Sequence, residues 1–485
     1  MSNIMMHLPY STPEAEGVSS AAVLDFVNYL DSLEFLHGFV LFRHGKVIAR
    51  GNWKPYCDAQ PHQLFSLSKS FVSMAIGFLR AEGRLELTDR VISFFPEYDD
   101  DSVPAEVREI TLHDLLTMRS GQPQCYLGAF TVLEPYTSPY AYRWLRKELK
   151  WKPGTHFNYN SGNTYMLSAV VTKLTGQPVT EYLWPRLFQP LGIETPRWLS
   201  DPQGINLGGW GLYLKLEDVA RFTLLLAQGG KWEGRQLIPE DYLKLATSAL
   251  ADNSENQRRD WENGYGLHFW RCSEPSSFRG DGAYGQYALV IPQYDMALAA
   301  LSGLGEMGRI LIHLWDHLLP TISGDAPLVP NPAEQEALAR KLNSLELPKP
   351  EGKYAAGVAG GTYLLEANPH RFQSVRFEFS AGGGQLVLRR DGSDFVVPFG
   401  YGCWREGGAQ IYETASTLSK AIASSAAWVE PNVLALHLAC LNEPHLVRYR
   451  FQFEGTRVQV KRQFNMLFLY GENEMNAEFS GTLQP

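Results

Sequence analysis

The pattern of apolar residues changes near residue 353, and this change restricts the chain to two structurally different parts. Beyond that point apolar and polar residues alternate, as in Val375-Arg376-Phe377-Glu378-Phe379, and a period of two is typical of half-buried strands. Glycine clusters at 382–384 and 407–408 separate such segments and suit tight turns. Residues 353–485 therefore predict an antiparallel β-barrel or sandwich domain.

The first 320 residues mix helical and strand patterns. A helix is expected from about Ala21 to Leu33, followed by a hairpin whose strands are Phe39–Phe42 and Val47–Ala49. Most of the segments that follow are helical, and strand patterns return late in this part. These late strands are expected at Tyr265–Trp270, Gln286–Ile291 and Met296–Leu301. We therefore predict for residues 1–320 an α/β (α+β) domain in which both ends of the segment build one antiparallel sheet flanked by helices.

Residues 321–352 are rich in proline and contain one polar helix, expected from about Ala333 to Leu345. This composition is typical of a linker between domains.

Composition excludes several classes of protein. The 485 residues are 45% hydrophobic and 20% charged, as in ordinary globular proteins. The net charge of -9 is spread along the chain without a basic stripe, which argues against nucleic acid as a partner. Since neither a membrane-spanning stretch nor a signal peptide is recognisable, we expect no membrane association and a cytoplasmic location. Five scattered cysteines without a C-x-x-C pair indicate no disulfide framework or zinc site, and neither a metal nor a cofactor is expected.

The segment Phe65-Ser66-Leu67-Ser68-Lys69 opens a long apolar run that predicts a buried helix. Ser66 and Lys69 are three residues apart and therefore lie on one face of that helix. Burial lowers the pKa of a lysine ammonium, so Lys69 could take the proton of the Ser66 hydroxyl. Free N–H groups at the first turn of the helix also suit an oxyanion. The alternative is that Ser66 only caps the helix and Lys69 extends to the surface; this Ser-x-x-Lys is the only one in the sequence.

A second informative segment is Pro153-Gly154-Thr155-His156-Phe157-Asn158-Tyr159. A phenol held near Ser66 and Lys69 could relay protons, first as base and then as acid, if the lysine charge lowers its pKa. The alternative is a tyrosine packed in the core at the end of a strand. The aromatic stretch from Gln122 to Pro153 could line a substrate cleft, or it could be ordinary packing.

Taken in order, these segments resemble the serine β-lactamase and penicillin-binding-protein superfamily, and within it the class C-like esterases, D-amino-acid peptidases and nylon-oligomer hydrolases. The resemblance covers roughly residues 10–320 and includes segments 112–121 and 216–239. It implies a β-lactamase/transpeptidase-like fold with an all-helical subdomain. It also implies that Ser66 is the acylated nucleophile and that Lys69 and Tyr159 share the duties of general base and acid.

Two departures from the family pattern bear on the substrate. Ser161 takes the place of the asparagine in the second motif, as in the nylon-oligomer hydrolases. The third motif matches Arg279-Gly280-Asp281-Gly282-Ala283-Tyr284-Gly285-Gln286-Tyr287. Gly280 stands where the family has a cation, and Arg279 is expected to point to the other face of the strand. The missing cation argues against β-lactamase or carboxypeptidase activity. The resemblance implies substrate contacts at Ser161, Gly282 and Ala283, with the Ala283 N–H as second oxyanion donor; the alternative for the glycine cluster is a simple tight turn.

The sequence therefore predicts a metal-free serine hydrolase that cleaves a small ester, amide or peptide through an acyl-enzyme on Ser66. One alternative is a penicillin-binding or ligand-sensing module with little turnover, or a β-lactamase or D-Ala carboxypeptidase. Another is a structural chain with a relict pocket. The C-terminal part resembles the lipocalin-like appendages of some family members, with Gly361-Thr362-Tyr363 as a cue. It could cover the cleft or form the contacts of a homo-oligomer.

Overall fold

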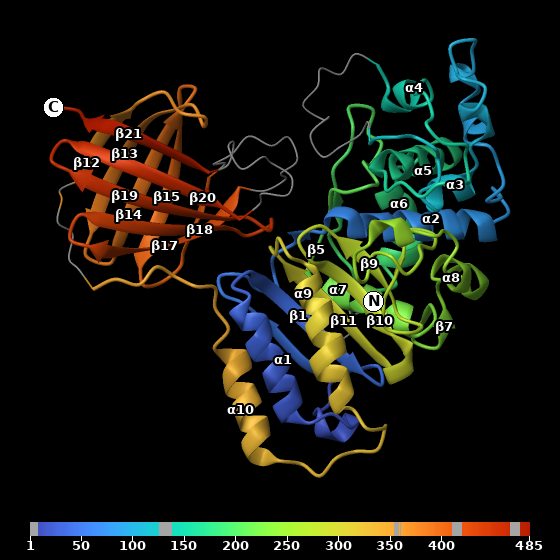
Figure 1. Ribbon diagram of the computed structural model, residues 1–485, viewed down its shortest axis with the longest axis horizontal. Helices are drawn as coiled ribbons and strands as arrows, with labels where there is room; N and C mark the ends of the chain where they lie inside the picture. The colour runs from blue at the N-terminus through green and yellow to red at the C-terminus, as the bar shows by residue number, and fades with distance from the viewer. Residues whose placement is uncertain (1–7, 126–137, 354–357, 359, 410–419, 466–475) are drawn as a thin grey trace, which may run out of the picture.

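The computed structural model describes residues 8–125, 138–353, 358, 360–409, 420–465 and 476–485. The described chain forms an N-terminal α/β domain and a C-terminal β-barrel, which Figure 1 shows in blue to yellow and in orange to red. Within these residues, we find no helix with both the length and the apolar character needed to span a membrane.

The N-terminal domain is built on a six-stranded antiparallel sheet with the strand order β2-β1-β11-β10-β9-β8. The strands are β1 (Leu36–Arg43), β2 (Lys46–Asn52), β8 (Trp270–Arg271), β9 (Phe278–Gly282), β10 (Gln286–Ile291) and β11 (Met296–Ser302). The first hairpin thus pairs with the last strand, which confirms that both ends of the domain build one sheet. The strand predicted over Tyr265–Trp270 is wrong, because only Trp270 of that range lies in a strand and His268 has a φ of 63°.

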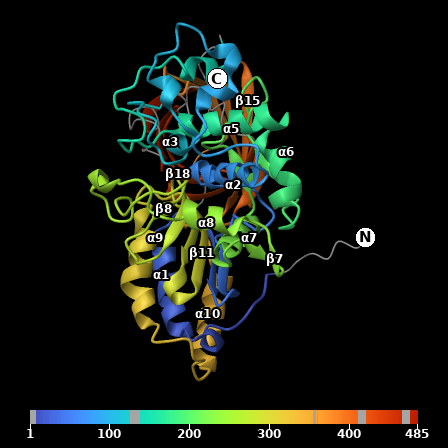
Figure 2. The same cartoon turned by 90° about the vertical axis from the view of Figure 1, so that its right-hand side faces the viewer.

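Helices cover both faces of this sheet, as Figures 1 and 2 show. Phe39 and Leu41 of β1 pack in one apolar core with α1 (Ser20–Ser32) and α9 (Gly308–His313). Val40 and Phe42 point to the opposite face and pack with α2 (Ser68–Ala81) and α7 (Leu216–Ala227). Because every second residue meets a different core, the central strands are apolar along their whole length.

A helical subdomain lies beyond α2, and Figure 1 shows it in cyan and green. Its helices are α3 (Leu112–Leu116), α4 (Tyr140–Trp144), α5 (Ser161–Thr175) and α6 (Val179–Leu183). Thr111 caps α3 through a capping box with Asp114, as the sequence indicates. The helix ends at Leu116, and Met118 just beyond it adopts a left-handed φ of 58°.

Short elements complete the domain. They are β3 (His62–Gln63), β4 (Arg197–Trp198), β5 (Leu212–Leu214), β6 (Lys231–Trp232), β7 (Arg235–Gln236) and α8 (Glu240–Ala246). Strands β3, β5 and β4 form a small sheet beside the start of α2. This sheet fixes the backbone immediately before residue 66, because Gln63 pairs with Tyr213.

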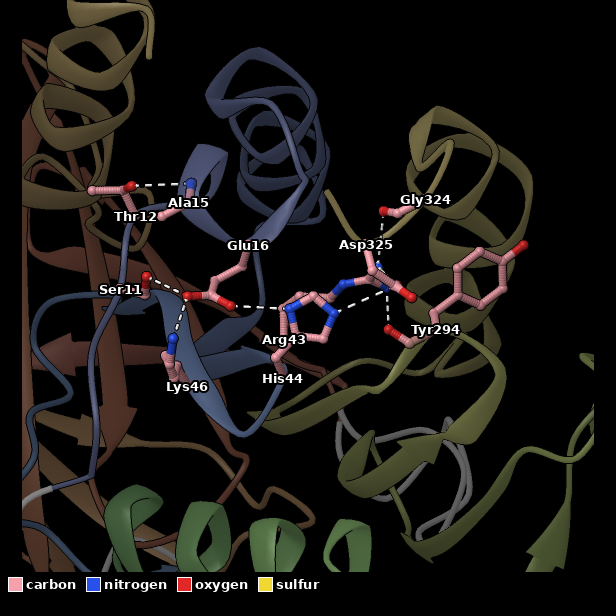
Figure 3. Close-up of polar contacts among 10 residues, drawn as sticks. All are labelled: Ser11, Thr12, Ala15, Glu16, Arg43, His44, Lys46, Tyr294, Gly324 and Asp325. Atoms are coloured by element: carbon pink, nitrogen blue, oxygen red, sulfur yellow. Dashed lines mark hydrogen bonds and ion pairs between the residues drawn. The ribbon is translucent and has the colours of Figure 1, made fainter. Parts of the chain in front are cut away.

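The segment that follows the N-terminal domain is hydrogen-bonded to the β1–β2 hairpin, as Figure 3 shows. The Arg43 side chain is 1% exposed and donates hydrogen bonds to the carbonyls of Tyr294 and Gly324 and to Asp325 Oδ1 at 2.7 Å. On the same hairpin, Lys46 Nζ donates to Glu16 Oε1 at 2.7 Å. The following helix, α10 (Pro332–Asn343), packs against α1.

Ten strands form the C-terminal barrel in the order β15-β14-β13-β12-β21-β20-β19-β18-β17-β16. They are β12 (Gly361–Leu365), β13 (Phe372–Ser380), β14 (Gly383–Arg390), β15 (Ser393–Tyr401), β16 (Arg405–Gly408), β17 (Ala421–Glu430), β18 (Val433–Cys440), β19 (Leu446–Glu454), β20 (Arg457–Phe464) and β21 (Ala477–Leu483). The predicted barrel is confirmed. Its pairs are antiparallel except that β15 also pairs with β17 in parallel, and this pair closes the barrel.

The barrel contacts the N-terminal domain through the loop between β18 and β19. The Gln63 N–H donates to the Asn442 carbonyl at 2.9 Å, and the Tyr56 hydroxyl lies 3.2 Å from the Glu443 carbonyl. The Tyr213 hydroxyl donates to the Glu443 carboxyl group. This loop of the barrel is therefore bonded to the backbone three residues before Ser66.

Four titratable side chains are buried at this contact, and we call them the interface cluster: His37, His62, Glu443 and His445. The His37 and His62 rings are hydrogen-bonded at 2.9 Å. Burial lowers the pKa of His62 to about 4 and raises the pKa of Glu443 to about 8. The cluster is thus uncharged near neutral pH.

Candidate active site

Ser66 lies in a 3₁₀ turn, Phe65–Leu67, that leads directly into α2. Phe65 has a left-handed φ of 47°, an unfavourable conformation for a large side chain. The centroid of its ring lies 5.4 Å from that of Tyr284, which belongs to the segment matched to the third motif. The strained residue therefore directs Ser66, which is half-buried, toward a cavity.

Lys69 is 1% exposed and makes three polar contacts. Its Nζ atom lies 2.8 Å from Ser66 Oγ, 3.0 Å from Ser161 Oγ and 2.6 Å from the Gly209 carbonyl oxygen. Burial lowers the pKa of Lys69 to about 7, so a large fraction of the amine is neutral at neutral pH. A neutral amine keeps two N–H donors for Ser161 and Gly209, which leaves its lone pair for the Ser66 hydroxyl.

Tyr159 makes a hydrogen bond with Ser66, and its ring centroid lies 4.8 Å from Lys69 Nζ. Burial raises the pKa of Tyr159 above its usual range, and the Ser66 bond only opposes this rise. The expectation that the lysine charge lowers this pKa is therefore wrong. The physical reason is that burial acts on both groups and keeps the phenol protonated while it removes charge from Lys69.

Ser161 is the first residue of α5, whose N-cap is Asn160. The Asn160 Oδ1 atom accepts a hydrogen bond from the Gly162 N–H at 2.8 Å, which fixes the start of the helix. The Ser161 hydroxyl consequently accepts a hydrogen bond from the Lys69 amine. The structure thus brings Ser66, Lys69, Tyr159 and Ser161 together from two distant segments.

The two glycines of the third motif let strand β9 approach the turn that carries Ser66. A Cβ atom at Gly282 would lie 2.2 Å from the Leu64 carbonyl oxygen, and one at Gly280 would lie 2.4 Å from Leu67 Cδ1. Only glycine allows this approach. Arg279 lies on the opposite face, as predicted, where its guanidinium contacts Asp281 at 2.8 Å.

A cavity of about 400 Å³ opens beside Ser66. Its wall consists of Ser66, Tyr159, Asn256, Arg258, Trp261, Trp270, Asp281, Ala283, Tyr284, Gly305 and Met307. Ala283 and Ser66 both line it, so their backbone N–H groups are candidates for an oxyanion hole. A larger cavity of about 1140 Å³ lies between residues 346–353 and the barrel, and its described lining contains none of these residues.

The cavity wall differs from the sequence-based expectation. No described residue of Gln122–Pro153 lines the cavity beside Ser66, so for the described part the alternative of ordinary packing is favoured over a substrate cleft. Tyr126, Phe130 and Tyr136 lie outside the described residues. Sequence reasoning missed Arg258, Trp261, Trp270 and Met307, whose only signal was the aromatic content near residue 270.

The described side chains form no cluster of three or more histidine, cysteine, aspartate or glutamate residues suited to a metal ion. The contacts of Ser66 with the Lys69 amine and the Tyr159 phenol are those of a serine activated by an amine, with a phenol beside it.

Residues 37–309 match the family model described as Beta-lactamase, and this range holds the whole group around Ser66. The chain belongs to the β-lactamase family. This finding confirms the predicted superfamily, the β-lactamase-like fold and the prediction of a hydrolytic enzyme.

Relatives of this β-lactamase-family chain include a 6-aminohexanoate-dimer hydrolase from Paenarthrobacter ureafaciens. It is 25% identical over 301 residues, which cover 54% of this chain and 71% of that protein. Esterase EstB from Burkholderia gladioli is 29% identical over 172 residues, or 33% of this chain and 44% of the esterase. The solved octameric penicillin-binding protein homologue from Pyrococcus abyssi has a TM-score of 0.50 at 15% identity. That match covers 95% of this chain and 99% of the homologue, so the similarity in fold includes the barrel.

Proposed function

We propose that this protein hydrolyses a small amide or ester through an acyl-enzyme formed on Ser66. The observation that carries the proposal is the position of the Lys69 amine, 2.8 Å from Ser66 Oγ and with its pKa lowered to about 7, beside a cavity. A group that is half neutral near pH 7 is well suited to act as general base. The hydrolase and esterase names of the two relatives agree with this reaction class.

Each residue of the group has a separate role in the proposed reaction. Lys69 takes the proton of Ser66 as its oxygen attacks the carbonyl carbon. The N–H groups of Ser66 and Ala283 stabilise the oxyanion. Tyr159, which stays protonated and contacts Ser66, passes a proton to the leaving group and regains one from Lys69. Ser161 orients the amine, and water then releases the acyl group from Ser66.

A penicillin-binding or ligand-sensing module with little turnover is the second candidate. The observation in its favour is Gly280, which lies against Leu67 and offers no cation at the third motif. Such a module would bind or acylate without releasing product. Multiple turnovers of any substrate by the same Ser66 centre would therefore decide against it.

The first experiment is an intact-mass measurement after the protein is mixed with a fluorophosphonate, with p-nitrophenyl butyrate and with a penicillin. We expect one fluorophosphonate adduct, steady ester turnover and no penicillin hydrolysis. Ser66→Ala should abolish the adduct and lower turnover by at least about 10³-fold. Ser70→Ala is the matched control, since Ser70 lies on the same helix and its hydroxyl donates to the His268 carbonyl at 3.0 Å. An adduct that persists in Ser66→Ala would refute the proposal.

Two broader predictions belong with this proposal. We propose that the domains extend over residues 1–320 and 353–485, joined by a linker, and that the barrel supports contacts of a homo-oligomer. The octameric state named for the Pyrococcus abyssi homologue supports the second idea. Light scattering of the purified chain tests it. The cytoplasmic location stays a prediction.

A further inference from the structure

The wall of the cavity beside Ser66 carries a carboxylate. Asp281 is 6% exposed and lines the cavity together with Ser66 and Tyr159. The Arg279 guanidinium holds one of its oxygens, because Nε and Nη2 lie 2.9 and 2.8 Å from Asp281 Oδ2. Among the described residues no side chain or backbone group is bonded to Oδ1. Asp281 therefore offers the cavity an unused acceptor oxygen on an almost fully buried side chain.

Arg279 favours the ionised form of this carboxyl group and contacts only its Oδ2 atom. Its side chain is 0% exposed and lies 4.6 Å from the Trp261 ring, behind the cavity wall. Burial raises the pKa of Asp281, while the adjacent guanidinium opposes this rise. Both Arg279 nitrogens contact the same oxygen, Oδ2, so this guanidinium does not occupy Oδ1. Oδ1 is consequently available to a donor that enters from the cavity.

The other walls suit the same kind of ligand. Trp270 and Tyr284 present aromatic rings, which attract an ammonium group more than a carboxylate, whereas the Trp261 ring already stacks with Arg258 and Arg279. The one cationic side chain among the described lining residues is Arg258, which is exposed and stacks on Trp261 at 4.3 Å. The wall of the cavity thus includes an acidic side chain and aromatic rings, and the one cation among its described lining residues, Arg258, is exposed.

We propose that Asp281 is a specificity residue that selects substrates with an ammonium group on the part held beside Ser66. This inference rests on the proposed hydrolysis at Ser66 and names the substrate class of that site. A carboxylate on the same part of the substrate would meet Asp281 Oδ1 and be rejected, because two like charges would be brought together in a buried place. Because strand β9 has Gly280 where the family has a cation, no positive side chain at that position repels an ammonium group on the substrate.

The test compares three ligands of equal chain length on the whole protein: n-pentylammonium, 1-pentanol and pentanoate. Their competitive inhibition constants are measured against p-nitrophenyl butyrate hydrolysis at pH 7.5. We expect the ammonium to bind about tenfold more tightly than the alcohol, and pentanoate to bind most weakly. Equal inhibition by ammonium and alcohol, or tighter binding of pentanoate, would overturn the proposal.

Two variants distinguish a direct contact between Asp281 and the ammonium group from the general electrostatic field of the cavity. Asp281→Asn should reduce the preference for ammonium over alcohol to about twofold or less. Arg258→Gln changes the charge of the same cavity by one unit at its exposed edge and should keep the preference. If Arg258→Gln strengthens ammonium binding as much as Asp281→Asn weakens it, the contact with Asp281 is refuted. Asp281→Asn leaves Arg279 buried without its partner and could unfold the chain, but the ligand series on the unaltered protein decides the question alone.

A failure of the proposed function has a different signature. If p-nitrophenyl butyrate is not hydrolysed and no Ser66 adduct forms, the hydrolase proposal fails. The three ligands are then titrated directly by tryptophan fluorescence, since Trp261 and Trp270 line the cavity. The ammonium preference is expected in that measurement as well, and its absence would refute the role of Asp281 independently.

Discussion

The centre around Ser66 and the interface cluster both bury titratable side chains, but they use burial differently. At the nucleophile, Lys69 is buried beside a cavity and its amine contacts a half-buried hydroxyl. At the interface, His62 and Glu443 are buried among protein groups, and neither lines the cavity beside Ser66. Burial shifts the pKa in both places. A perturbed pKa therefore indicates chemistry only where a nucleophile and a space for substrate accompany it.

The largest expected effect comes from Lys69→Met, which tests whether the amine is the base. We expect kcat/KM to fall about 10³-fold. In the unaltered protein kcat/KM should rise with pH through about 7, because the neutral amine is the active form. The variant should also unfold at a higher temperature at pH 7. The Lys69 amine binds a proton more readily in the unfolded chain than in the native state, and this difference destabilises the native state of the unaltered protein.

The measurements are a pH–rate profile and thermal unfolding followed by circular dichroism. A profile of the unaltered protein that stays flat from pH 6 to 8 would contradict the role of Lys69 as base. It would also weaken the contrast between the two buried regions, because the shifted pKa at the nucleophile would then be without function.

An intermediate effect is expected for Gly282→Ala. The added Cβ would lie 2.2 Å from the Leu64 carbonyl oxygen, so strand β9 must move away from the turn that carries Ser66. We expect kcat to fall about 10- to 100-fold with a smaller change in KM, because the oxyanion donors separate. Gly382→Ala in the barrel is the matched control, since a Cβ there meets no atom within 4 Å. Steady-state kinetics of both variants gives the comparison, and an unchanged kcat in Gly282→Ala would argue against an oxyanion donor at Ala283.

The smallest effect on catalysis is expected for Glu443→Gln in the interface cluster. The carboxyl group has a pKa of about 8 in the folded chain and about 4.5 in the unfolded chain. The native state therefore binds more protons between these values, and its stability falls as the pH rises through this window. Glu443→Gln should lack this pH-dependent loss of stability. The difference in melting temperature, variant minus unaltered protein, should therefore increase from pH 5 to pH 9.

Turnover of p-nitrophenyl butyrate by Glu443→Gln should stay within about twofold at pH 7, because an amide preserves a neutral partner for Tyr213. A loss comparable to that of Lys69→Met would show that the interface cluster takes part in catalysis. The distinction between the two regions would then fail.

The sequence allowed the relation between Ser66 and Lys69 to be predicted, because it depends on helical spacing alone. The joining of both ends of the domain in one sheet was predictable because apolar runs at both ends need partners, whereas the order of the strands was not predicted. The cavity wall was not, since Trp261 and Trp270 are placed by loops, and residues such as His268 adopt a left-handed φ that no periodicity reveals. The contacts of Glu443 with Tyr56 and Tyr213 were equally hidden, because they join residues more than 200 positions apart.

The hydrogen bond from the Gln63 N–H to the Asn442 carbonyl has a consequence for the design of shortened variants. A chain that stops before the barrel would leave that amide without its partner and expose His37 and His62 to water. The histidines could then be protonated near neutral pH, directly beside the turn that presents the nucleophile. The barrel should accordingly be treated as a scaffold of the reactive centre and retained in any minimal catalyst built from this protein.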